Sequence, residues 1–350
     1  MATVAEHLPE STKRAIRGSP IYAPYLRLAN STYAKRLRLR KQILTAFPYW
    51  INIELTNRCN LKCTYCPRPK MTHLQLEDMD LSLFKRIVDA FSAIVTERTT
   101  FTPVGLGEPL MYRELPEALK YLKVRYPMVL VHIDTNGTLL NRQKSEMLCR
   151  SLGSGDALLV SLNAGSPITY SKLNGAAKYE LVVDNIRTFL QIRAQLRRGP
   201  TLSIQLLETG ITAGEVQSFR EFWTPLITEG DAICIKPIRD WAGRVQVEEY
   251  ASDQQSPERY PCLTLWKDMV FDVDGNVYPC CQGLATKGSD ELLLGNIQGR
   301  SLKEIYSGNR IRQMRREHLK GRWHAVPECS RCKAWDQFPN IWFKIGRKWM

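Results

Sequence analysis

Six short apolar segments, separated by longer amphipathic ones, constrain the fold of this chain more than any other feature. The apolar segments, expected to be strands, are residues 50–55, 99–106, 129–135, 157–163, 202–208 and 232–238. The amphipathic segments, expected to be helices, are 82–94, 114–124, 141–151, 178–196 and 215–227. Such alternation is typical of a parallel sheet with crossover helices. It predicts an α/β fold, a partial (βα)6 TIM-like barrel, whose two missing units leave an open side for substrate.

After residue 240 the pattern changes. The segment "VFDVDGNVYPCC" predicts a hairpin that turns at Asp274 and Gly275, and "SLKEIYSGNRIRQMRREHLKGR" predicts one or two charged helices. We expect a small C-terminal α+β domain that binds a cluster. The predicted organisation is a basic, mostly helical extension over 1–49, the barrel over 50–240, the small domain over 241–335, and an aromatic and basic tail over 336–350.

The ten cysteines are unevenly placed, since eight of them fall into two groups and only Cys149 and Cys234 stand alone. No apolar run approaches the roughly 18 residues of a membrane span, and the N-terminus does not read as a secretory signal. We therefore expect a cytoplasmic protein. Thiols stay reduced in the cytosol, so grouped cysteines there favour metal binding over disulfides.

The first group is "CNLKCTYC", with Cys59, Cys63 and Cys66 in a C-x3-C-x2-C spacing directly after the first predicted strand. Thiolates suit zinc or iron–sulfur clusters, but a structural zinc site needs four protein ligands. Three thiolates on a cube of four irons leave one iron without a protein ligand. A chelating small molecule can bind that iron.

This motif at the end of a first barrel strand resembles the signature of the radical S-adenosylmethionine (SAM) superfamily. The resemblance implies a [4Fe–4S] cluster held by the three cysteines, with the amine and carboxylate of SAM on the fourth iron. It further implies that one electron cleaves SAM to methionine and a 5′-deoxyadenosyl radical. The electron would come from an external donor similar to flavodoxin or ferredoxin.

Other strand ends carry residues that match the family's SAM contacts. "GLGEPL" resembles the Gly-Gly-Glu motif, in which a backbone approaches SAM and a carboxylate meets its ammonium group. "DTNGT" would lie near the SAM carboxylate, and "SLNA" near the ribose and methionyl groups. An aromatic residue before the last cysteine would pack beside the adenine. The resemblance thus implies these SAM contacts: Tyr65, Gly105, Gly107, Glu108, Thr135, Asn136, Ser161 and Asn163.

The second cysteine group resembles the auxiliary-cluster domain called SPASM, or its shorter Twitch form. The resemblance implies a second, auxiliary [4Fe–4S] cluster with four protein ligands: Cys262, Cys280, Cys329 and Cys332. Cys281 is expected to be a bystander, because adjacent side chains point apart. A structural zinc site with four thiolates is the alternative, since it would use the same ligand set.

Polar residues at the late strand ends are the catalytic candidates. Glu208, Lys236 and Asp240, with the neighbouring Arg239, could handle a proton of a substrate alcohol or amine. Cys234 could return a hydrogen atom to a substrate radical, which would make the reaction a redox-neutral epimerisation. Free cysteine is more often a small buried hydrophobe, and surface ion pairs explain the charged residues equally well.

The net charge of +14 is concentrated at the two ends of the chain, with +7 in residues 1–50 and +8 in residues 301–350. Basic ends could contact nucleic acid or a membrane surface. Solvated helix faces, and a tail "FPNIWFKIGRKWM" that packs on the barrel, are the favoured interpretation. A small-molecule substrate, in some cases anionic, is the expected partner.

These features predict a radical SAM oxidoreductase of the dehydrogenase type. Its expected substrate is a small polar metabolite, such as a sugar, an aminocyclitol or a nucleotide-like compound, oxidised with help from the auxiliary cluster. Only 58 residues precede Cys59, which is short for the leader-binding domain of many peptide-modifying relatives. A peptide or protein maturase, an epimerase and an RNA-modifying enzyme stay open as alternatives.

Overall fold

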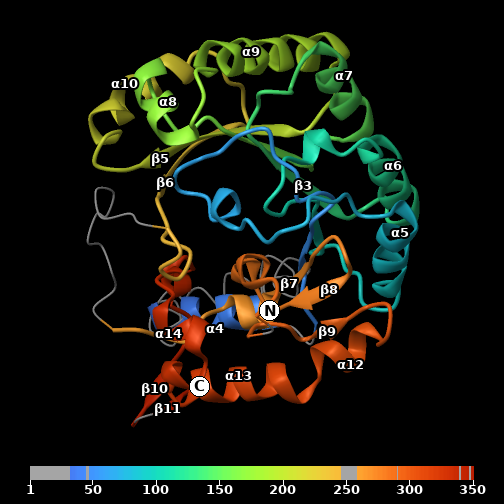
Figure 1. The fold of residues 1–350 in the computed structure, drawn as a ribbon, viewed down its shortest axis with the longest axis vertical. Helices are drawn as coiled ribbons and strands as arrows, with labels where there is room; N and C mark the ends of the chain where they lie inside the picture. The colour runs from blue at the N-terminus through green and yellow to red at the C-terminus, as the bar shows by residue number, and fades with distance from the viewer. Residues whose placement is uncertain (1–31, 45–46, 246–257, 290, 339, 347) are drawn as a thin grey trace, which may run out of the picture.

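The computed structural model describes residues 32–44, 47–245, 258–289, 291–338, 340–346 and 348–350. Six parallel strands form the barrel wall (Figure 1): β1 (Trp50–Ile53), β2 (Thr100–Thr102), β3 (Leu130–Thr135), β4 (Ala157–Ser161), β5 (Thr201–Glu208) and β6 (Ala232–Pro237). Each strand lies within the apolar segment that predicts it, except that β5 begins one residue earlier. The predicted partial (βα)6 barrel is therefore confirmed.

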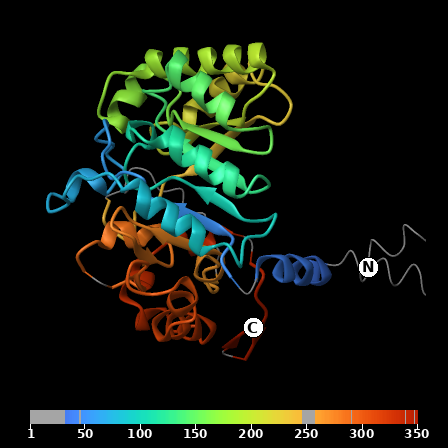
Figure 2. The same cartoon turned by 90° about the vertical axis from the view of Figure 1, so that its right-hand side faces the viewer.

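Helices cover the outer face of this wall (Figure 2): α5 (Leu81–Ala90), α6 (Leu115–Arg125), α7 (Arg142–Ser151), α9 (Tyr179–Leu196) and α10 (Val216–Trp223). Their apolar faces are buried, as in α5, where Phe84, Ile87 and Val88 pack on the sheet. Burial of such side chains stabilises the fold by about 2 kcal/mol each. Among the helices that the structure describes, none is long and apolar enough to cross a membrane.

One helix, α8 (Pro167–Asn174), is missing from the sequence prediction. The side chain of Ser166 accepts a hydrogen bond from the Thr169 N–H, Pro167 occupies the first turn, and Gly175 ends the helix with φ of +65°. These are ordinary helix start and stop signals. The eight-residue helix is too short to show a clear amphipathic period, which explains the omission.

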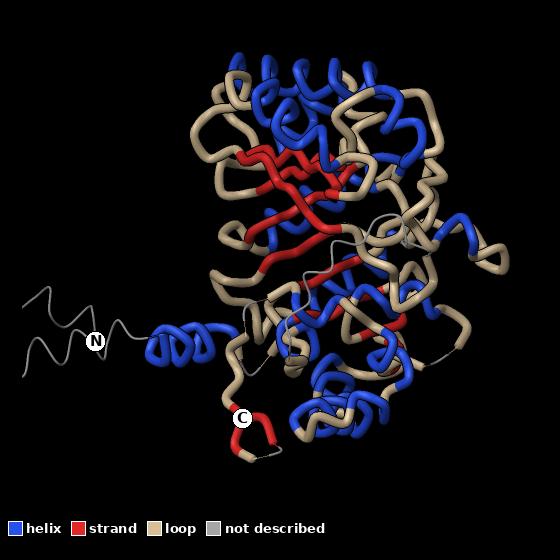
Figure 3. The backbone as a smooth tube through the Cα atoms, turned by 90° about the vertical axis from the view of Figure 1, so that its left-hand side faces the viewer, coloured by secondary structure: helices blue, strands red, loops and turns tan. Residues whose placement is uncertain are grey.

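Three further strands continue the same sheet beyond β1 (Figure 3), so that the order is β6-β5-β4-β3-β2-β1-β7-β8-β9. Strand β7 (Asp268–Phe271) is parallel to β1, and the predicted hairpin joins β7 to β8 (Asn276–Tyr278). Gly275 turns the chain with φ of +79°. Strand β9 is Gly295–Asn296. The C-terminal segment thus shares the sheet of the barrel, and a boundary at residue 240 stays a prediction.

Short helices complete this C-terminal segment: α11 (Thr264–Lys267), α12 (Leu302–Tyr306), α13 (Asn309–Leu319) and α14 (Pro327–Arg331). The predicted charged helix over 301–322 is therefore a pair, α12 and α13. Ser301 begins α12 with a capping box, in which Ser301 and Glu304 each bond the backbone N–H of the other.

Helix α4 and the C-terminal tail lie side by side (Figure 2). Helix α4 (Thr32–Ile43) donates hydrogen bonds from Arg36 to the carbonyls of Asn340 and Trp342. The tail ends in a small hairpin of β10 (Lys344–Ile345) and β11 (Lys348–Trp349), and Trp342 and Trp349 are buried. The tail aromatics therefore form a core with Tyr260, and residues 1–31 of the predicted helical extension lie outside the described residues.

Candidate active site and cysteine centres

The loop after β1 carries Cys59, Cys63 and Cys66, all partly exposed. Its backbone is folded tightly, because the Cys66 N–H donates to the Cys63 carbonyl at 3.2 Å. The guanidinium of Arg68 donates to the carbonyls of Cys59 at 3.0 Å and Leu61 at 3.2 Å. These bonds fix the three thiol-bearing residues in one turn-rich segment at the carboxyl end of the barrel strand.

The end of β3 is tied to both the Gly-rich loop and the cysteine loop. The Glu108 carboxylate, 2% exposed, accepts hydrogen bonds from the Thr135 hydroxyl at 2.6 Å and the Asn136 N–H at 2.8 Å. It also accepts from the Leu110 N–H at 3.0 Å. The Asn136 amide reaches the Cys59 sulfur at 3.9 Å. A carboxylate has about four lone-pair positions, so Glu108 keeps room for one more donor.

Two glycines let the Gly-rich loop approach the strand β1 and the cysteine loop. A Cβ atom on Gly107 would lie 2.1 Å from the Thr56 carbonyl oxygen and 2.6 Å from that of Arg58. A Cβ on Gly105 would lie 2.4 Å from the Glu54 side chain. The Glu108 N–H then donates to the Arg58 carbonyl at 2.7 Å. Only glycine permits this close approach of the two loops.

A chain of side-chain hydrogen bonds crosses the barrel beside the cysteine loop. Gln205 on β5 donates to Asn163 at 2.8 Å, and Asn163 donates to the Tyr65 hydroxyl at 2.6 Å. The Tyr65 hydroxyl donates to Asn174 at 2.7 Å. Asn163 has φ of +64°, a left-handed conformation that asparagine tolerates, just past the end of β4. Ser161 is the last residue of β4 and is half-buried.

Burial raises the pKa of the Cys66 thiol to about 11 and that of Cys63 to about 12. Thiolates in this loop therefore need a cationic partner, which a metal cluster supplies. The Asn174 amide nitrogen is buried and has no hydrogen-bond partner among the described residues, while its oxygen contacts Cys63 at 3.5 Å. Three converging thiols with an unsatisfied donor beside them fit a sulfur-rich cluster bound at this loop.

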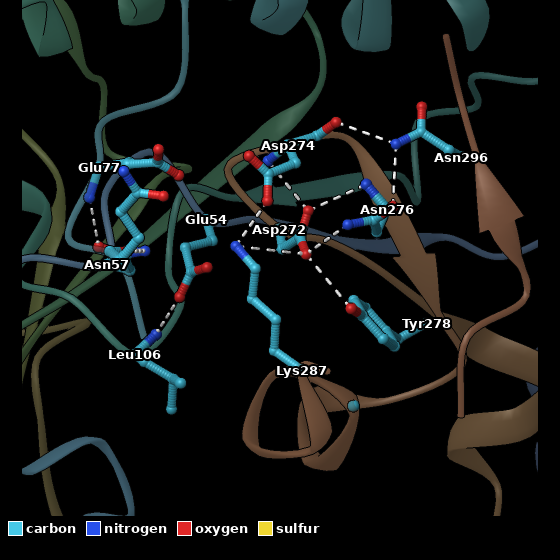
Figure 4. A network of polar contacts seen from close by, with 12 residues as sticks. Glu54, Asn57, Glu77, Leu106, Asp272, Asp274, Asn276, Tyr278, Lys287 and Asn296 are labelled. Atoms are coloured by element: carbon cyan, nitrogen blue, oxygen red, sulfur yellow. Dashed lines mark hydrogen bonds and ion pairs between the residues drawn. The ribbon is translucent and has the colours of Figure 1, made fainter. Parts of the chain in front are cut away.

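Polar side chains from the start of the cysteine loop and from the C-terminal segment lie close together (Figure 4). Glu54, at the end of β1, accepts a hydrogen bond from the Leu106 N–H at 2.7 Å. Lys287, which follows the Cys280–Cys281 segment, pairs with Asp274 at 2.6 Å and lies 3.9 Å from Asp272. Asp272 is fully buried and accepts from Asn276 and Tyr278, so the network holds the hairpin β7–β8 as well.

Burial raises the pKa of Glu54 to about 8, so the native state favours its protonated form. Because the folded pKa lies above the unfolded value of 4.5, this preference stabilises the fold fully below pH 4.5, and the stabilisation is lost progressively as the pH rises from there to about 8. We expect Glu54→Gln to gain stability relative to the wild type between pH 6 and 8, on the order of 3 kcal/mol. Thermal unfolding of the anaerobic, cluster-loaded protein measures it.

The exposed Glu97→Gln is the matched control for this comparison, and its unfolding temperature should follow the wild type across the same pH range. Parallel curves for Glu54→Gln and the wild type would mean that Glu54 does not titrate on unfolding in this window.

The second cysteine group surrounds one cavity of about 70 Å³. Cys262 precedes α11, Cys280 follows β8, Cys329 lies in α14 and Cys332 follows it, so three separate elements supply the thiols. Cys281 lines the same cavity although its residue is solvent-exposed. Burial raises the pKa of Cys332 to about 11. Whether Cys281 is a bystander stays a prediction.

The same cavity contains polar atoms that lack partners among the residues described. They are the Nε2 of His318, the side-chain oxygen of Gln282 and the Nε of Arg259. Buried polar atoms are nearly always satisfied in folded proteins. Five thiols and unsatisfied donors around one small cavity therefore fit a sulfur-rich cluster. No three His, Cys, Asp or Glu side chains within the described ranges are arranged to hold a single metal ion.

The catalytic candidates lie at different places around the barrel mouth. Cys234 on β6 stands in register with Gln205, and Lys236 lies two residues further on the same face. Both therefore share the face on which Gln205 contacts Asn163, the barrel interior. Glu208 is exposed and out of phase with Gln205, on the other face. Asp240 is half-buried and close enough to help raise the pKa of Cys332, an effect secondary to burial.

The residue Arg239 donates to Asp336 at 3.0 Å, an ion pair between the strand β6 exit and the C-terminal segment. Cys149 is fully buried in the apolar core, as expected for a small hydrophobe. An open surface cavity of about 970 Å³ lies at the opposite, amino ends of the strands and is lined by Arg187, Arg197 and Arg198 among others. It is remote from all the cysteine groups and is not part of this site.

Sequence reasoning missed the buried polar residues that hold the two sites. Glu54 interrupts the apolar run of the first predicted strand. This pattern could have indicated a buried polar contact, because a buried carboxylate needs partners. Asn174, Gln205 and His318 gave none, since each is a single polar residue in an ordinary helix or strand pattern. Their roles follow only from the long-range contacts that the fold creates.

Comparison with known protein families finds a match in each of two parts of the chain. The model of the radical SAM superfamily matches residues 53–195, and that of the SPASM iron–sulfur cluster-binding domain matches 262–333. A GTP 3′,8-cyclase from Chlorobaculum tepidum is 26% identical over 195 residues, which are 55% of this chain and 54% of that protein. The chain thus spans about half the length of this relative. An uncharacterized protein from Treponema pallidum is 24% identical over 81% of this chain and 79% of its own.

Two solved structures share the fold. BtrN in complex with AdoMet and 2-DOIA has a TM-score of 0.54 at 17% identity, covering 82% of this chain and 93% of BtrN. Streptococcus suis SuiB bound to the precursor peptide SuiA has a TM-score of 0.60 at 15% identity, covering 89% of this chain and 76% of SuiB. At such low identity the likeness establishes the fold alone.

Proposed function

Because this chain is a radical SAM enzyme with a C-terminal SPASM iron–sulfur domain, we propose that it oxidises an alcohol or amine carbon of a small polar metabolite by two electrons. A sugar, an aminocyclitol or a nucleotide-like compound is the proposed substrate class. Cys59, Cys63 and Cys66 would hold the SAM-binding [4Fe–4S] cluster. Cys262, Cys280, Cys329 and Cys332 would hold one auxiliary [4Fe–4S] cluster.

The observation that carries this proposal is the set of thiols around the second cavity. Four of its cysteines would give a cluster four protein ligands, which leaves no iron free to bind a substrate. A cluster there would act as an electron carrier, and an electron carrier is needed when the substrate radical loses a second electron. When bound, these groups would supply one-electron cleavage of SAM to a 5′-deoxyadenosyl radical and uptake of one electron at the second cluster.

The residues of the chain have matching tasks in this proposal. Glu108 would bind the SAM ammonium group with its remaining lone pair, and Tyr65 would flank the adenine. Lys236, which is exposed and shares the strand face of Cys234, and Asp240 would take the O–H or N–H proton of the substrate. The carbon-bound hydrogen leaves as part of 5′-deoxyadenosine, the proton goes to this base, and one electron leaves the substrate radical.

Release of 5′-deoxyadenosine tests the proposal. Anaerobic, reduced protein is mixed with SAM and with fractions of the source cell's extract. We expect a burst with the low-molecular-weight filtrate, and no burst from the Cys59, Cys63 and Cys66 triple alanine variant. A burst that requires the macromolecular fraction and is lost after protease treatment would contradict a small substrate.

A peptide substrate is the second candidate, because SuiB was solved with its precursor peptide and covers 89% of this chain in the comparison. The open edge of the barrel at β6, where the strand is partly exposed, could admit an extended chain. Protease sensitivity of the activating fraction separates this candidate from the first. Nuclease sensitivity would instead point to RNA.

A further inference from the structure

His318 is a buried histidine whose environment fixes the position of its proton. It lies near the end of α13 and is 0% exposed. Its Nδ1 accepts a hydrogen bond from the Cys262 N–H at 3.3 Å. An imidazole nitrogen that accepts a hydrogen bond carries no proton, so the ring is neutral and its single proton is on Nε2.

His318 lines the cavity of the second cysteine group together with Cys262, Cys280, Cys329 and Cys332. Nε2 is buried and has no hydrogen-bond partner within the part of the chain that the structure describes. The ring is also held edge-on against Trp323, with 5.2 Å between centroids, so it has little freedom to turn elsewhere. A buried donor in this position needs an acceptor inside the cavity.

The position of the proton on His318 excludes a role as a metal ligand through Nε2 and indicates a role as a hydrogen-bond donor. A histidine that binds a metal through Nε2 must have no proton on that nitrogen, and here the proton is on it because Nδ1 accepts the Cys262 N–H. Hydrogen bonds to cluster sulfur atoms, in contrast, need a donor of this kind. Reduction adds an electron to a cluster and increases the negative charge on its sulfurs, so such a bond favours the reduced form.

We propose that His318 donates its Nε2–H to a sulfur atom of the auxiliary cluster and thereby raises the reduction potential of that cluster. This inference rests on the proposed function in one respect, that an iron–sulfur cluster occupies the second cavity. It gives the cluster a property that an electron acceptor needs. His318 is a tuning residue and contacts neither substrate nor SAM in this proposal.

A potentiometric titration of the auxiliary cluster tests the proposal. The Cys59, Cys63 and Cys66 triple alanine background leaves one cluster, whose reduction is followed by electron paramagnetic resonance with redox mediators. His318→Asn keeps an acceptor near the Cys262 N–H but lacks a donor at Nε2, and His318→Gln places an amide N–H near that position. We expect His318→Asn to lower the reduction potential of the cluster by about 59 mV, which is a reduced-to-oxidised ratio about tenfold lower at a fixed potential. His318→Gln should stay near the wild type.

Equal shifts in both variants, or no shift in either, would overturn the proposal. Loss of iron from His318→Asn alone would make His318 a ligand, which also contradicts it. The unmutated protein labelled with 15N-histidine provides a second measurement that does not depend on the folding of a variant. Electron–nuclear double resonance of the reduced cluster should show one weak histidine nitrogen coupling, too small for a ligand, and its absence would refute the hydrogen bond. Neither experiment uses a substrate, so both are independent of the proposed oxidation.

Discussion

Replacing Cys59, Cys63 and Cys66 together by alanine will abolish SAM cleavage and lower the iron content from about eight to about four atoms per chain. The three thiols lie in one loop that is held by Arg68 and by the backbone, and the loop has no other thiol within it. Loss of the three ligands therefore removes the whole cluster. Iron analysis and 5′-deoxyadenosine assay of anaerobically purified protein measure the two effects.

The buried Cys149, which belongs to the apolar core, provides the matched control. Cys149→Ala removes a thiol but should leave about eight irons and full SAM cleavage. The remaining four irons of the triple variant should disappear when Cys262, Cys280, Cys329 and Cys332 are also replaced. Zinc in place of iron at the second site would refute the auxiliary cluster. An unchanged iron content in the triple variant would refute a cluster bound by Cys59, Cys63 and Cys66.

Gly107→Ala will displace the cysteine loop and weaken SAM binding at least tenfold, with a loss of about 3 kcal/mol in the free energy of unfolding. The new methyl group would lie 2.1 Å from the Thr56 carbonyl oxygen and 2.6 Å from that of Arg58. Both are backbone atoms that cannot rotate away, so the two loops must separate. The bond from the Glu108 N–H to the Arg58 carbonyl would break with them.

Equilibrium binding of SAM and thermal unfolding, both under anaerobic conditions, measure this result. Gly214→Ala is the control, because a Cβ there has nothing within 4 Å and the residue has no left-handed backbone. It should bind SAM as the wild type does. Wild-type affinity and stability in Gly107→Ala would show that the two loops tolerate more separation than their contacts imply.

Much of the fold was predictable from local patterns. The strands of a parallel barrel are buried on both faces, so they appear as continuous apolar runs, and all six were found within a few residues. The cysteine groups were equally visible, because their spacing is local and thiols are scarce elsewhere in the chain. The hairpin was predictable from Asp274 and Gly275, because the conformation of a turn depends on the residues within it.

What could not be predicted depends on contacts between distant segments. The position of β7 beside β1 joins residues more than two hundred positions apart, and no local pattern encodes it. The partners of Glu54 and His318 likewise come from other elements, so their burial and their protonation follow only from the assembled fold. The sequence favours a tail that packs on the barrel, whereas in the structure the tail aromatics form a core with Tyr260 beside α4.

The parallel pairing of β1 with β7 has a consequence for any attempt to produce the barrel alone. A fragment ending near residue 240 would leave the hydrogen-bonding side of β1 bare, with the buried Ile51 and Ile53 beside it. An uncovered edge strand of this kind invites pairing with other chains and aggregation. The C-terminal segment thus covers an edge of the barrel that would otherwise be prone to aggregation, and the two cysteine-bearing parts are best expressed and studied as one polypeptide.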